Sequence, residues 1–305
     1  MGRSVTVRVP AKVNLGLGVV AARPDGYHEL VTVFHAVGLY DEVVVEQLPA
    51  GSGVTVRVTG EGAAEVPLGE DNIAARAAIL AAAKAGASPD LTIRIIKSIP
   101  VAGGMAGGSA DAAAVLMACA TLWSGLDRGE LPSMAALLGS DVPFLLRGGT
   151  MLATGRGENL TPVLARGEFH WVVALSESQL STAAVYAEWD RLCSEGAVAP
   201  SSADADADLL QALRAGDPAA LGRALRNDLQ SAAVSLLPAL ERTLEAGHEL
   251  GALGGIVSGS GPTCVFLARD REHALDIAVG LTTTGLVRSV KHVVGPVPGA
   301  TVVGD

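Results

Sequence analysis

The chain has 305 residues, of which 49% are hydrophobic and 18% charged, so its composition is that of a folded globular protein rather than a disordered one. Its formal net charge of −10 argues against binding to nucleic acid or an anionic membrane, because both are bound mainly through clustered lysine and arginine. Three widely spaced cysteines without a C-x-x-C pair predict a reduced, cytoplasmic protein, and we expect neither a signal peptide nor a membrane-spanning helix.

The N-terminal part of the chain is rich in strand signals. Alternating or continuous β-branched residues predict separate strands over residues 4–9, 13–20, 30–37, 43–47 and 54–58. Residues 22–26 have the composition of a turn. An alanine-rich helix is expected over residues 72–85, ending at Gly86, and is followed by a strand over residues 91–96.

The most distinctive segment links this last strand to an apolar helix. It reads Pro100-Val101-Ala102-Gly103-Gly104-Met105-Ala106-Gly107-Gly108-Ser109-Ala110-Asp111. Glycine lets the backbone approach an anion, and a helix start offers free N–H groups and the positive end of the helix dipole. The segment lacks the lysine of a Walker A motif and spells neither the dinucleotide-binding nor the protein-kinase glycine pattern. We therefore expect a cradle for a polyphosphate; the alternative is a tight turn with glycines for close packing.

The remaining elements suggest a second domain. The helix after the glycine loop should end near Gly125, and another, over residues 131–138, should be closed by Gly139. A new strand over residues 171–175 follows a polar stretch, so we place the domains at residues 1–160 and 161–305. Further helices are expected over residues 217–229, 239–251 and 273–282, and strands over 256–257, 264–267 and 287–294, with a second glycine turn at 258–263. The acidic run at residues 201–208 is interpreted as a solvated loop or helix start, not a metal site.

Several polar residues stand out against apolar surroundings. Lys12 and Asn14 interrupt an apolar strand and point to the same face; a surface lysine on an edge strand is the alternative. Asp141 lies in a turn between apolar residues, where a partly desolvated carboxylate can accept a proton; helix capping is the alternative. Tyr27 and His28 are two of the few ring side chains in the N-terminal half. No His, Cys and Asp residues have the spacing of a zinc site.

Together these segments resemble the GHMP small-molecule kinases, whose ATP motif matches the glycine loop. One branch of the family is matched more closely, by Pro10-Ala11-Lys12-Val13-Asn14-Leu15, Arg23-Pro24-Asp25-Gly26-Tyr27-His28, Gly139-Ser140-Asp141-Val142-Pro143-Phe144 and Gly155-Arg156-Gly157-Glu158. The resemblance covers nearly the whole chain. The family usually has a further glycine where this chain has Ala102, a small change that should not alter the role of the loop.

The resemblance implies an α+β fold with the active site in the cleft between two domains. The N-terminal domain would be like domain 2 of ribosomal protein S5 and the C-terminal domain ferredoxin-like. The implied reaction is ATP-dependent phosphorylation of the 2-hydroxyl of a cytidylyl sugar-alcohol diphosphate, in the non-mevalonate pathway to isoprenoids. The protein would be a monomer or weak homodimer that acts on small molecules.

The resemblance also implies roles for individual residues. ATP would be bound by Pro100, Val101, Ala102, Gly103, Gly104, Met105, Ala106, Gly107, Gly108, Ser109 and Ala110. Mg²⁺ would bridge the phosphates near the Ser109 hydroxyl, without a dedicated protein metal site. Asp141 would take or orient the proton of the tertiary hydroxyl, while Lys12 keeps Asp141 ionised and neutralises the transferring phosphoryl group. The substrate would be bound by Asn14, Tyr27, His28, Thr182 and Tyr186, with the tyrosine rings above and below the cytosine and His28 at its edge; the match at Thr182 and Tyr186 is looser.

Two other classes of function are weighed against this one. A homoserine- or mevalonate-type kinase of the same family would share the glycine loop but would lack the Asp-Gly-Tyr-His segment. A non-catalytic nucleotide-binding protein would lack a lysine and a carboxylate placed for phosphoryl transfer, which asks a protein mainly for positioning and electrostatic stabilisation.

Overall fold

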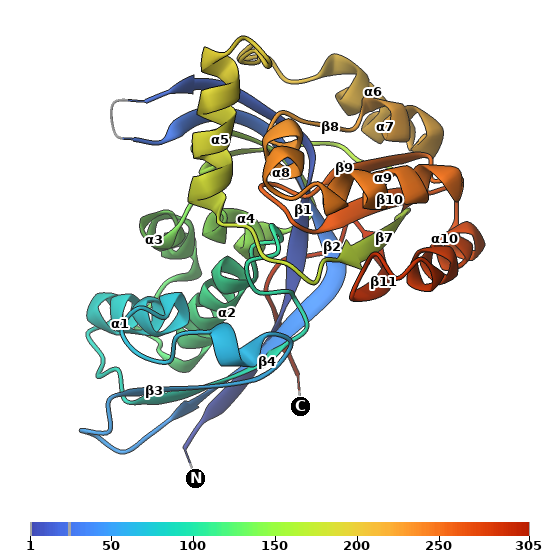
Figure 1. Ribbon diagram of the computed structural model, residues 1–305. Helices are drawn as coiled ribbons and strands as arrows, with labels where there is room; N and C mark the ends of the chain where they lie inside the picture. The colour runs from blue at the N-terminus through green and yellow to red at the C-terminus, as the bar shows by residue number, and fades with distance from the viewer. Residues whose placement is uncertain (1, 24–25, 305) are drawn as a thin grey trace.

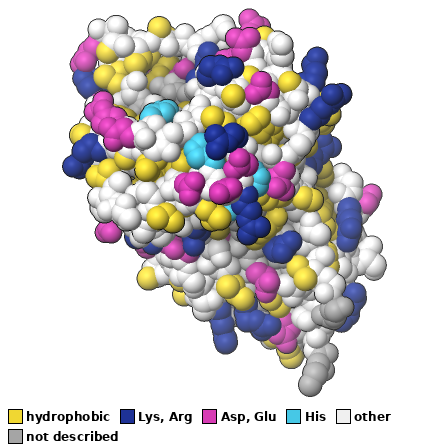
Figure 2. Space-filling model, turned by 90° about the vertical axis from the view of Figure 1, so that its right-hand side faces the viewer, with side chains coloured by type: hydrophobic (Ala, Val, Ile, Leu, Met, Phe, Trp, Pro, Cys, Tyr) yellow, Lys and Arg dark blue, Asp and Glu magenta, His cyan; other side chains and the backbone are white. Residues whose placement is uncertain are grey.

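The computed structural model describes residues 2–23 and 26–304 (Figure 1). Pro24 and Asp25, which belong to the turn expected at residues 22–26, lie outside the described residues. Within the described part of the chain, no helix combines the length and the apolar character needed to cross a membrane. Figure 2 shows one face of the molecule, on which basic and acidic side chains are interspersed.

A long antiparallel hairpin forms the centre of the first sheet. Its two strands are β1 (Ser4–Ala22) and β2 (His28–Gln47). The prediction of two shorter strands within each of them is wrong, because the ladder continues through irregularities at Pro10/Ala11, Asn14/Gly16 and Val19/Ala21. Bulges of this kind absorb a proline, which has no N–H to donate, and bend the strand without ending it.

Six more strands complete this eight-stranded sheet, which has the central order β12-β1-β2-β4-β3. They are β3 (Val54–Gly60), β4 (Leu91–Lys97), β5 (Thr150–Gly155), β6 (Asn159–Pro162), β8 (Arg226–Asn227) and β12 (Thr301–Val303). The last two come from the C-terminal half of the chain and pair with β1. The first sheet is therefore built from both halves of the sequence, and the domain division at residue 160 stays a prediction.

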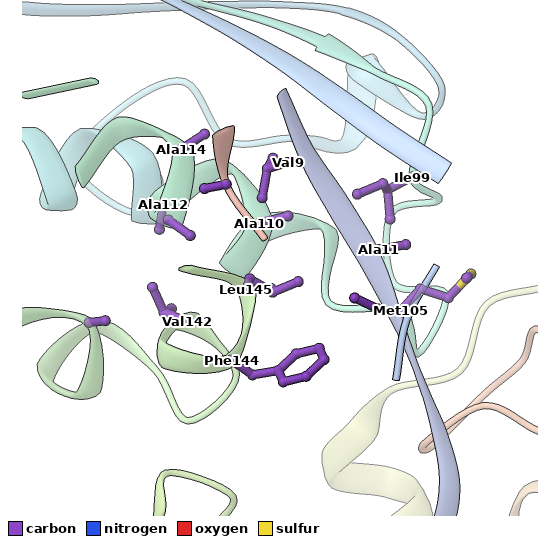
Figure 3. Close-up of a cluster of buried hydrophobic side chains, with 14 of the residues drawn as sticks. Val9, Ala11, Ile99, Met105, Ala110, Ala112, Ala114, Val142, Phe144 and Leu145 are labelled. Carbon is purple, nitrogen blue, oxygen red and sulfur yellow. The ribbon is translucent and has the colours of Figure 1, made fainter. Parts of the chain in front are cut away.

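Four helices pack beside this sheet (Figure 1): α1 (Ile73–Ala85), α2 (Gly107–Leu122), α3 (Leu131–Leu138) and α4 (Val142–Arg147). As predicted, α1 starts after Asn72, which caps it, and ends at Gly86 in the left-handed conformation. Helix α2 is buried along most of its length, between β1 and α4. Figure 3 shows side chains of β1, α2 and α4 meeting in the core. Two short 3₁₀ helices, η1 (Ala63–Glu65) and η2 (Arg128–Glu130), lie in the connections.

The second sheet has four antiparallel strands in the order β11-β7-β10-β9. They are β7 (Phe169–Leu175), β9 (Gly254–Val257), β10 (Cys264–Ala268) and β11 (Ser289–Gly295). Both faces are buried: Trp171 and Val265 join the core of the first sheet, whereas Val172 and Phe266 join a second core. The helices of this half are α5 (Thr182–Ser194), α6 (Ala207–Ala215), α7 (Pro218–Ala224), α8 (Gln230–Leu236), α9 (Ala239–Glu249) and α10 (Arg271–Thr283).

The helix predicted over residues 217–229 is wrong in its second half. Helix α7 ends at Ala224, and Arg226 and Asn227 pair in parallel with Gly16 and Leu17 of β1. The Asn227 side chain donates to the carbonyl groups of Val257 and Gly259, which holds this segment extended. By contrast, the acidic run does lead into a helix start, because Asp206 caps α6.

Candidate active site

The glycine loop connects β4 to α2 and has an unusual backbone. Ala102, Gly104 and Ala106 have φ values of 51°, 72° and 61°. In the described part of the chain, Ala102 and Ala106 are the residues other than glycine with positive φ. This conformation is unfavourable for an L-residue by about 1–2 kcal/mol and is retained where the surrounding structure imposes it, often at functional sites. Because glycine adopts positive φ without steric cost, this backbone also explains why the family usually has a glycine where this chain has Ala102.

The loop is held between β1 and the turn at residues 258–263. The backbone N–H of Lys12 donates to the carbonyl of Met105 (3.2 Å), whose side chain is buried in the core (Figure 3). On the other side, the Ser258 hydroxyl donates to the carbonyl of Gly104 (3.2 Å). A Cβ atom on Gly104 would lie under 3.0 Å from the carbonyl oxygen of Ser258. Only glycine allows this close approach, so the turn at residues 258–263 fixes the position of the glycine loop.

A buried charge cluster lies beneath the loop, and the sequence reasoning missed it. The Lys97 ammonium contacts Asp41 (2.5 Å) and Asp111 (2.8 Å), and all three side chains are almost fully buried. A Cβ on Gly107 would lie 3.3 Å from the Lys97 Nζ, so the cluster adjoins the first turn of α2. A signal was present: Lys97 occupies an inward position in the strict alternation of β4.

The two carboxylates of this cluster share one cation. Asp41 also accepts hydrogen bonds from the backbone N–H groups of Ser98 and Ile99, whereas Asp111 Oδ1 is buried without a hydrogen-bond partner among the described residues. Burial raises the pKa of Asp111 well above its usual value, against the opposing effect of Lys97. For Lys97 itself, burial lowers the pKa but the two carboxylates outweigh it, so the pKa is raised. The cluster therefore holds a charged lysine under the loop.

Lys12 and Asn14 lie at the same site, on the face of β1 next to the loop. Both are buried, so the alternative of a surface lysine is wrong. Lys12 Nζ donates to Asn14 Oδ1 (2.6 Å), and Asn14 Nδ2 donates to the Thr32 hydroxyl (2.8 Å). Burial lowers the pKa of Lys12, and the nearby Asp141 carboxylate raises it. A Cβ on Gly259 would lie 3.3 Å from Lys12 Nζ, so the 258–263 turn also packs against the lysine.

Asp141 is the residue that precedes α4. Its side chain makes no capping hydrogen bond to that helix, so the capping alternative is wrong. Its negative charge instead acts on two groups from distant parts of the chain, raising the pKa of Lys12 and adding to the effect of burial on the pKa of Tyr186. Asp141 thus lies within electrostatic range of Lys12 and Tyr186.

Two of the predicted substrate-binding residues, His28 and Tyr186, meet where α5 lies against the end of the β1–β2 hairpin (Figure 1). His28 stacks on Tyr186, with ring centroids 4.8 Å apart and 23° between the planes, and its other near ring is Trp189. His28 Nε2 is 2.8 Å from a carboxylate oxygen of Asp190. Trp189 and Asp190 were missed, although they lie three and four residues after Tyr186 and so share its helix face.

Tyr27 and Thr182 lie outside the stacked pair of His28 and Tyr186. Tyr27 is 56% exposed, and the Arg156 guanidinium lies over its ring, 5.1 Å from the centroid. The Thr182 hydroxyl is 2.9 Å from that of Ser260, which ties the start of α5 to the 258–263 turn. The structure therefore stacks Tyr186 on His28 and places Arg156 over the ring of Tyr27.

A cavity of about 320 Å³ borders the glycine loop on the side of residues 100–103. Its other walls are formed by η1, residues 175–179 and the ion pair between Arg288 and Glu61 (2.6 Å). The loop is thus open to a volume that a small molecule can enter. Among the described residues, no group of three His, Cys, Asp or Glu side chains is arranged to hold a metal ion.

Comparison with known proteins gives this arrangement a context. The family "GHMP kinases N terminal domain" matches residues 72–149, and "GHMP kinases C terminal" matches residues 209–285. The curated 4-diphosphocytidyl-2-C-methyl-D-erythritol kinase of Nocardia farcinica is 55% identical over 300 residues, covering 98% of this chain and 96% of that protein. The chain belongs to the GHMP kinase family.

Further relatives of this GHMP kinase carry the same name or share only the fold. The Mycobacterium tuberculosis 4-diphosphocytidyl-2-C-methyl-D-erythritol kinase is 55% identical over 301 residues, covering 98% of this chain and 93% of the other. A crystal structure of 4-(cytidine 5'-diphospho)-2C-methyl-D-erythritol kinase superposes with a TM-score of 0.74 at 34% identity, covering 97% and 99% of the two chains. Homoserine kinase from Cytophaga hutchinsonii gives a TM-score of 0.75 at 18% identity, covering 99% and 98%, and so shows the fold alone. The predicted family and α+β fold are confirmed.

Proposed function

We propose that this GHMP kinase transfers the γ-phosphoryl group of ATP to the 2-hydroxyl of 4-diphosphocytidyl-2-C-methyl-D-erythritol, giving the 2-phosphate and ADP. The observation that supports the proposal is that buried Lys12 packs against the glycine loop and lies within electrostatic range of Asp141. If Lys12 were a surface lysine and Asp141 a helix cap, Lys12 would be exposed and the Asp141 side chain would accept a hydrogen bond from α4; neither is observed. The relatives with this name, at 55% identity over nearly the whole chain, support the choice of acceptor.

The glycine loop would bind the phosphates of ATP. Helix α2 starts at Gly107 without a side-chain cap, so the N–H groups of its first turn are available to phosphate oxygens, and the helix dipole favours the negative charge. The buried Lys97 ammonium pairs with Asp111 of α2 and with Asp41 of β2, so it anchors the start of this helix and adds no net positive charge. Mg²⁺ would enter with the phosphates and neutralise part of their charge, with the Ser109 hydroxyl as the near protein oxygen.

Lys12 and Asp141 would act on the reacting hydroxyl. Asp141 accepts or orients its proton, and the Lys12 ammonium neutralises charge on the transferring phosphoryl group. The hydrogen bond to Asn14 fixes where the Lys12 ammonium points, so the cation is in position before phosphoryl transfer begins. Asn14, itself held by Thr32, would help to place the acceptor.

His28 would distinguish cytosine from uracil. An ionised Asp190 can only accept a hydrogen bond, so it selects the tautomer of His28 with the proton on Nε2. In the neutral ring Nδ1 is then an acceptor, which suits the exocyclic amine of cytosine and not the carbonyl of uracil. Tyr186, Tyr27 and Thr182 would complete the substrate side, with the tyrosine rings supplying stacking surface.

The test is turnover with a panel of acceptors. The purified protein, Mg²⁺ and ATP are incubated with 4-diphosphocytidyl-2-C-methyl-D-erythritol, homoserine or mevalonate, and ADP release and the ³¹P NMR spectrum are recorded. We expect a new phosphate monoester only with the cytidylyl acceptor, and much slower formation of it with the Asp141→Asn variant at the same protein concentration. Transfer to homoserine or mevalonate instead would contradict the substrate, and ATP binding without transfer would favour a non-catalytic protein. We also expect the protein to act in the cytoplasm as a monomer or weak homodimer, which sedimentation equilibrium can check.

A further inference from the structure

The turn at residues 155–158 lies beside the active site and has no role in the function proposed so far. It follows β5, and a Cβ on Gly157 would lie 3.4 Å from the Phe34 ring and 3.7 Å from Ser140 Cβ. Ser140 immediately precedes Asp141, and Lys12 Nζ is 5.4 Å from the centroid of the Phe34 ring. One side of this turn therefore adjoins the place of phosphoryl transfer.

The other side of the turn reaches the base-binding end through Arg156. Its guanidinium lies 5.1 Å from the centroid of the Tyr27 ring, and Tyr27 is next to His28 in the chain. The turn thus spans the distance between the residues proposed to bind the base and those proposed to act on the hydroxyl. Arg156 is the positively charged residue of this turn, and it lies between the two groups of residues.

Hydrogen bonds hold this turn in place. The backbone N–H of Gly155 donates to Glu29 Oε1 (3.2 Å), and that of Arg156 donates to Glu158 Oε2 (2.6 Å). The Arg156 Nε is 3.9 Å from a carboxylate oxygen of Glu158, too long for a strong hydrogen bond, and the side chain is 37% exposed. Arg156 is therefore positioned by its backbone and by the Tyr27 ring while its guanidinium still faces solvent.

The chemistry of the substrate calls for a cation at this point. In a cytidylyl sugar-alcohol diphosphate, the two phosphates lie between the nucleoside and the alcohol. With the base at His28 and the hydroxyl at Asp141, the diphosphate lies between them, beside the 155–158 turn. The chain carries a net charge of −10, so no general positive field draws in this anion. Arginine presents a planar fork of donors that matches two phosphate oxygens at once.

We propose that Arg156 binds the diphosphate of the cytidylyl substrate, and that the Tyr27 ring holds its guanidinium ready through a cation–π contact. This inference rests on the proposed function. It makes Arg156 a substrate-binding residue that acts on affinity and leaves the transfer step to Lys12 and Asp141.

The test compares two ligands that differ only in the phosphates, CDP and cytidine. Their Kd values are measured by calorimetry for the wild-type protein, Arg156→Gln, Arg156→Lys and Arg57→Gln, the last being an exposed arginine on β3 and the matched control. A charged hydrogen-bonding group typically contributes about 10- to 100-fold to affinity, so Arg156→Gln should weaken CDP by that factor and leave cytidine unchanged. Arg156→Lys should recover part of the loss, and Arg57→Gln should match the wild type. In turnover, KM for the cytidylyl acceptor should rise in Arg156→Gln while KM for ATP and kcat stay the same.

The outcomes separate this inference from the proposed function. Unchanged CDP affinity in Arg156→Gln, or equal weakening of CDP and cytidine, would overturn the role of Arg156 while the wild-type enzyme still phosphorylates its acceptor. A wild-type protein that phosphorylates no cytidylyl acceptor would overturn the proposed function and this inference with it. Urea unfolding of Arg156→Gln with the wild-type midpoint is the control for folding.

Discussion

Gly104 connects the phosphate loop to the 258–263 turn, and its replacement by alanine gives a quantitative test of that contact. Two costs are expected. With φ of 72°, an L-residue pays about 1–2 kcal/mol for the left-handed conformation. The new Cβ would also lie under 3.0 Å from the Ser258 carbonyl oxygen, so backbone must move, and overpacking of this kind typically costs about 1–3 kcal/mol more. The sum is about 2–5 kcal/mol.

Gly149 is a matched control for this substitution. Its φ is 73°, almost the same as that of Gly104, but a Cβ there meets no atom within 4 Å among the described residues. Gly149→Ala should therefore incur only the conformational cost, about 1–2 kcal/mol. The difference between the two variants isolates the approach of the loop to the turn.

The assay combines urea unfolding with calorimetric titration of ATP. Gly104→Ala should be less stable than Gly149→Ala by about 1–3 kcal/mol at similar m-values, and it should bind ATP more weakly because the displaced loop no longer presents its N–H groups together. Gly149→Ala should bind ATP like the wild type. Equal stability and equal ATP affinity in the two variants would refute the reasoning, since the steric contact would then have no consequence.

Four further predictions address the charged groups and His28. Asp141→Asn should lower kcat by about 10²- to 10⁴-fold with ATP affinity retained, and adding Lys12→Ala should lower it little more, because both act on one proton transfer. Burial lowers the pKa of Lys12, so the alkaline fall in kcat/KM should begin below pH 10.5; in Asp141→Asn, which lacks the carboxylate that raises this pKa, it should move lower still. An unmoved alkaline limb would show that the two groups are not coupled. Lys97→Met leaves two buried carboxylates without their cation and should cost about 3–5 kcal/mol in urea unfolding; a cost below about 1 kcal/mol would contradict the buried ion pairs. His28→Ala should reduce the preference for cytidylyl over uridylyl analogues with KM for ATP unchanged, and full retention of that preference would make His28 a loop residue only.

Much of the site could be predicted because the signals are local. The glycine loop is recognisable from its composition, and the αL backbone at positions 102, 104 and 106 accounts for the small residues there. Lys12 and Asn14 share a face because residues two apart in a strand always do. The ends of α1 follow from Asn72 and Gly86, since capping depends on the residues at the helix ends.

Other features are decided by the tertiary structure, because they join segments far apart in the chain. Alternation in β4 has the same period whether Lys97 faces solvent or the core, and only the packing of α2 and β2 brings Asp111 and Asp41 to it. No local pattern brings Asp141 to Lys12, or Arg156 to Tyr27. The sequence by itself thus determined which elements and which chemical groups this GHMP kinase has, since these depend on neighbouring residues. Which groups meet was decided by the fold, since burial and charge pairing act between elements and not along them.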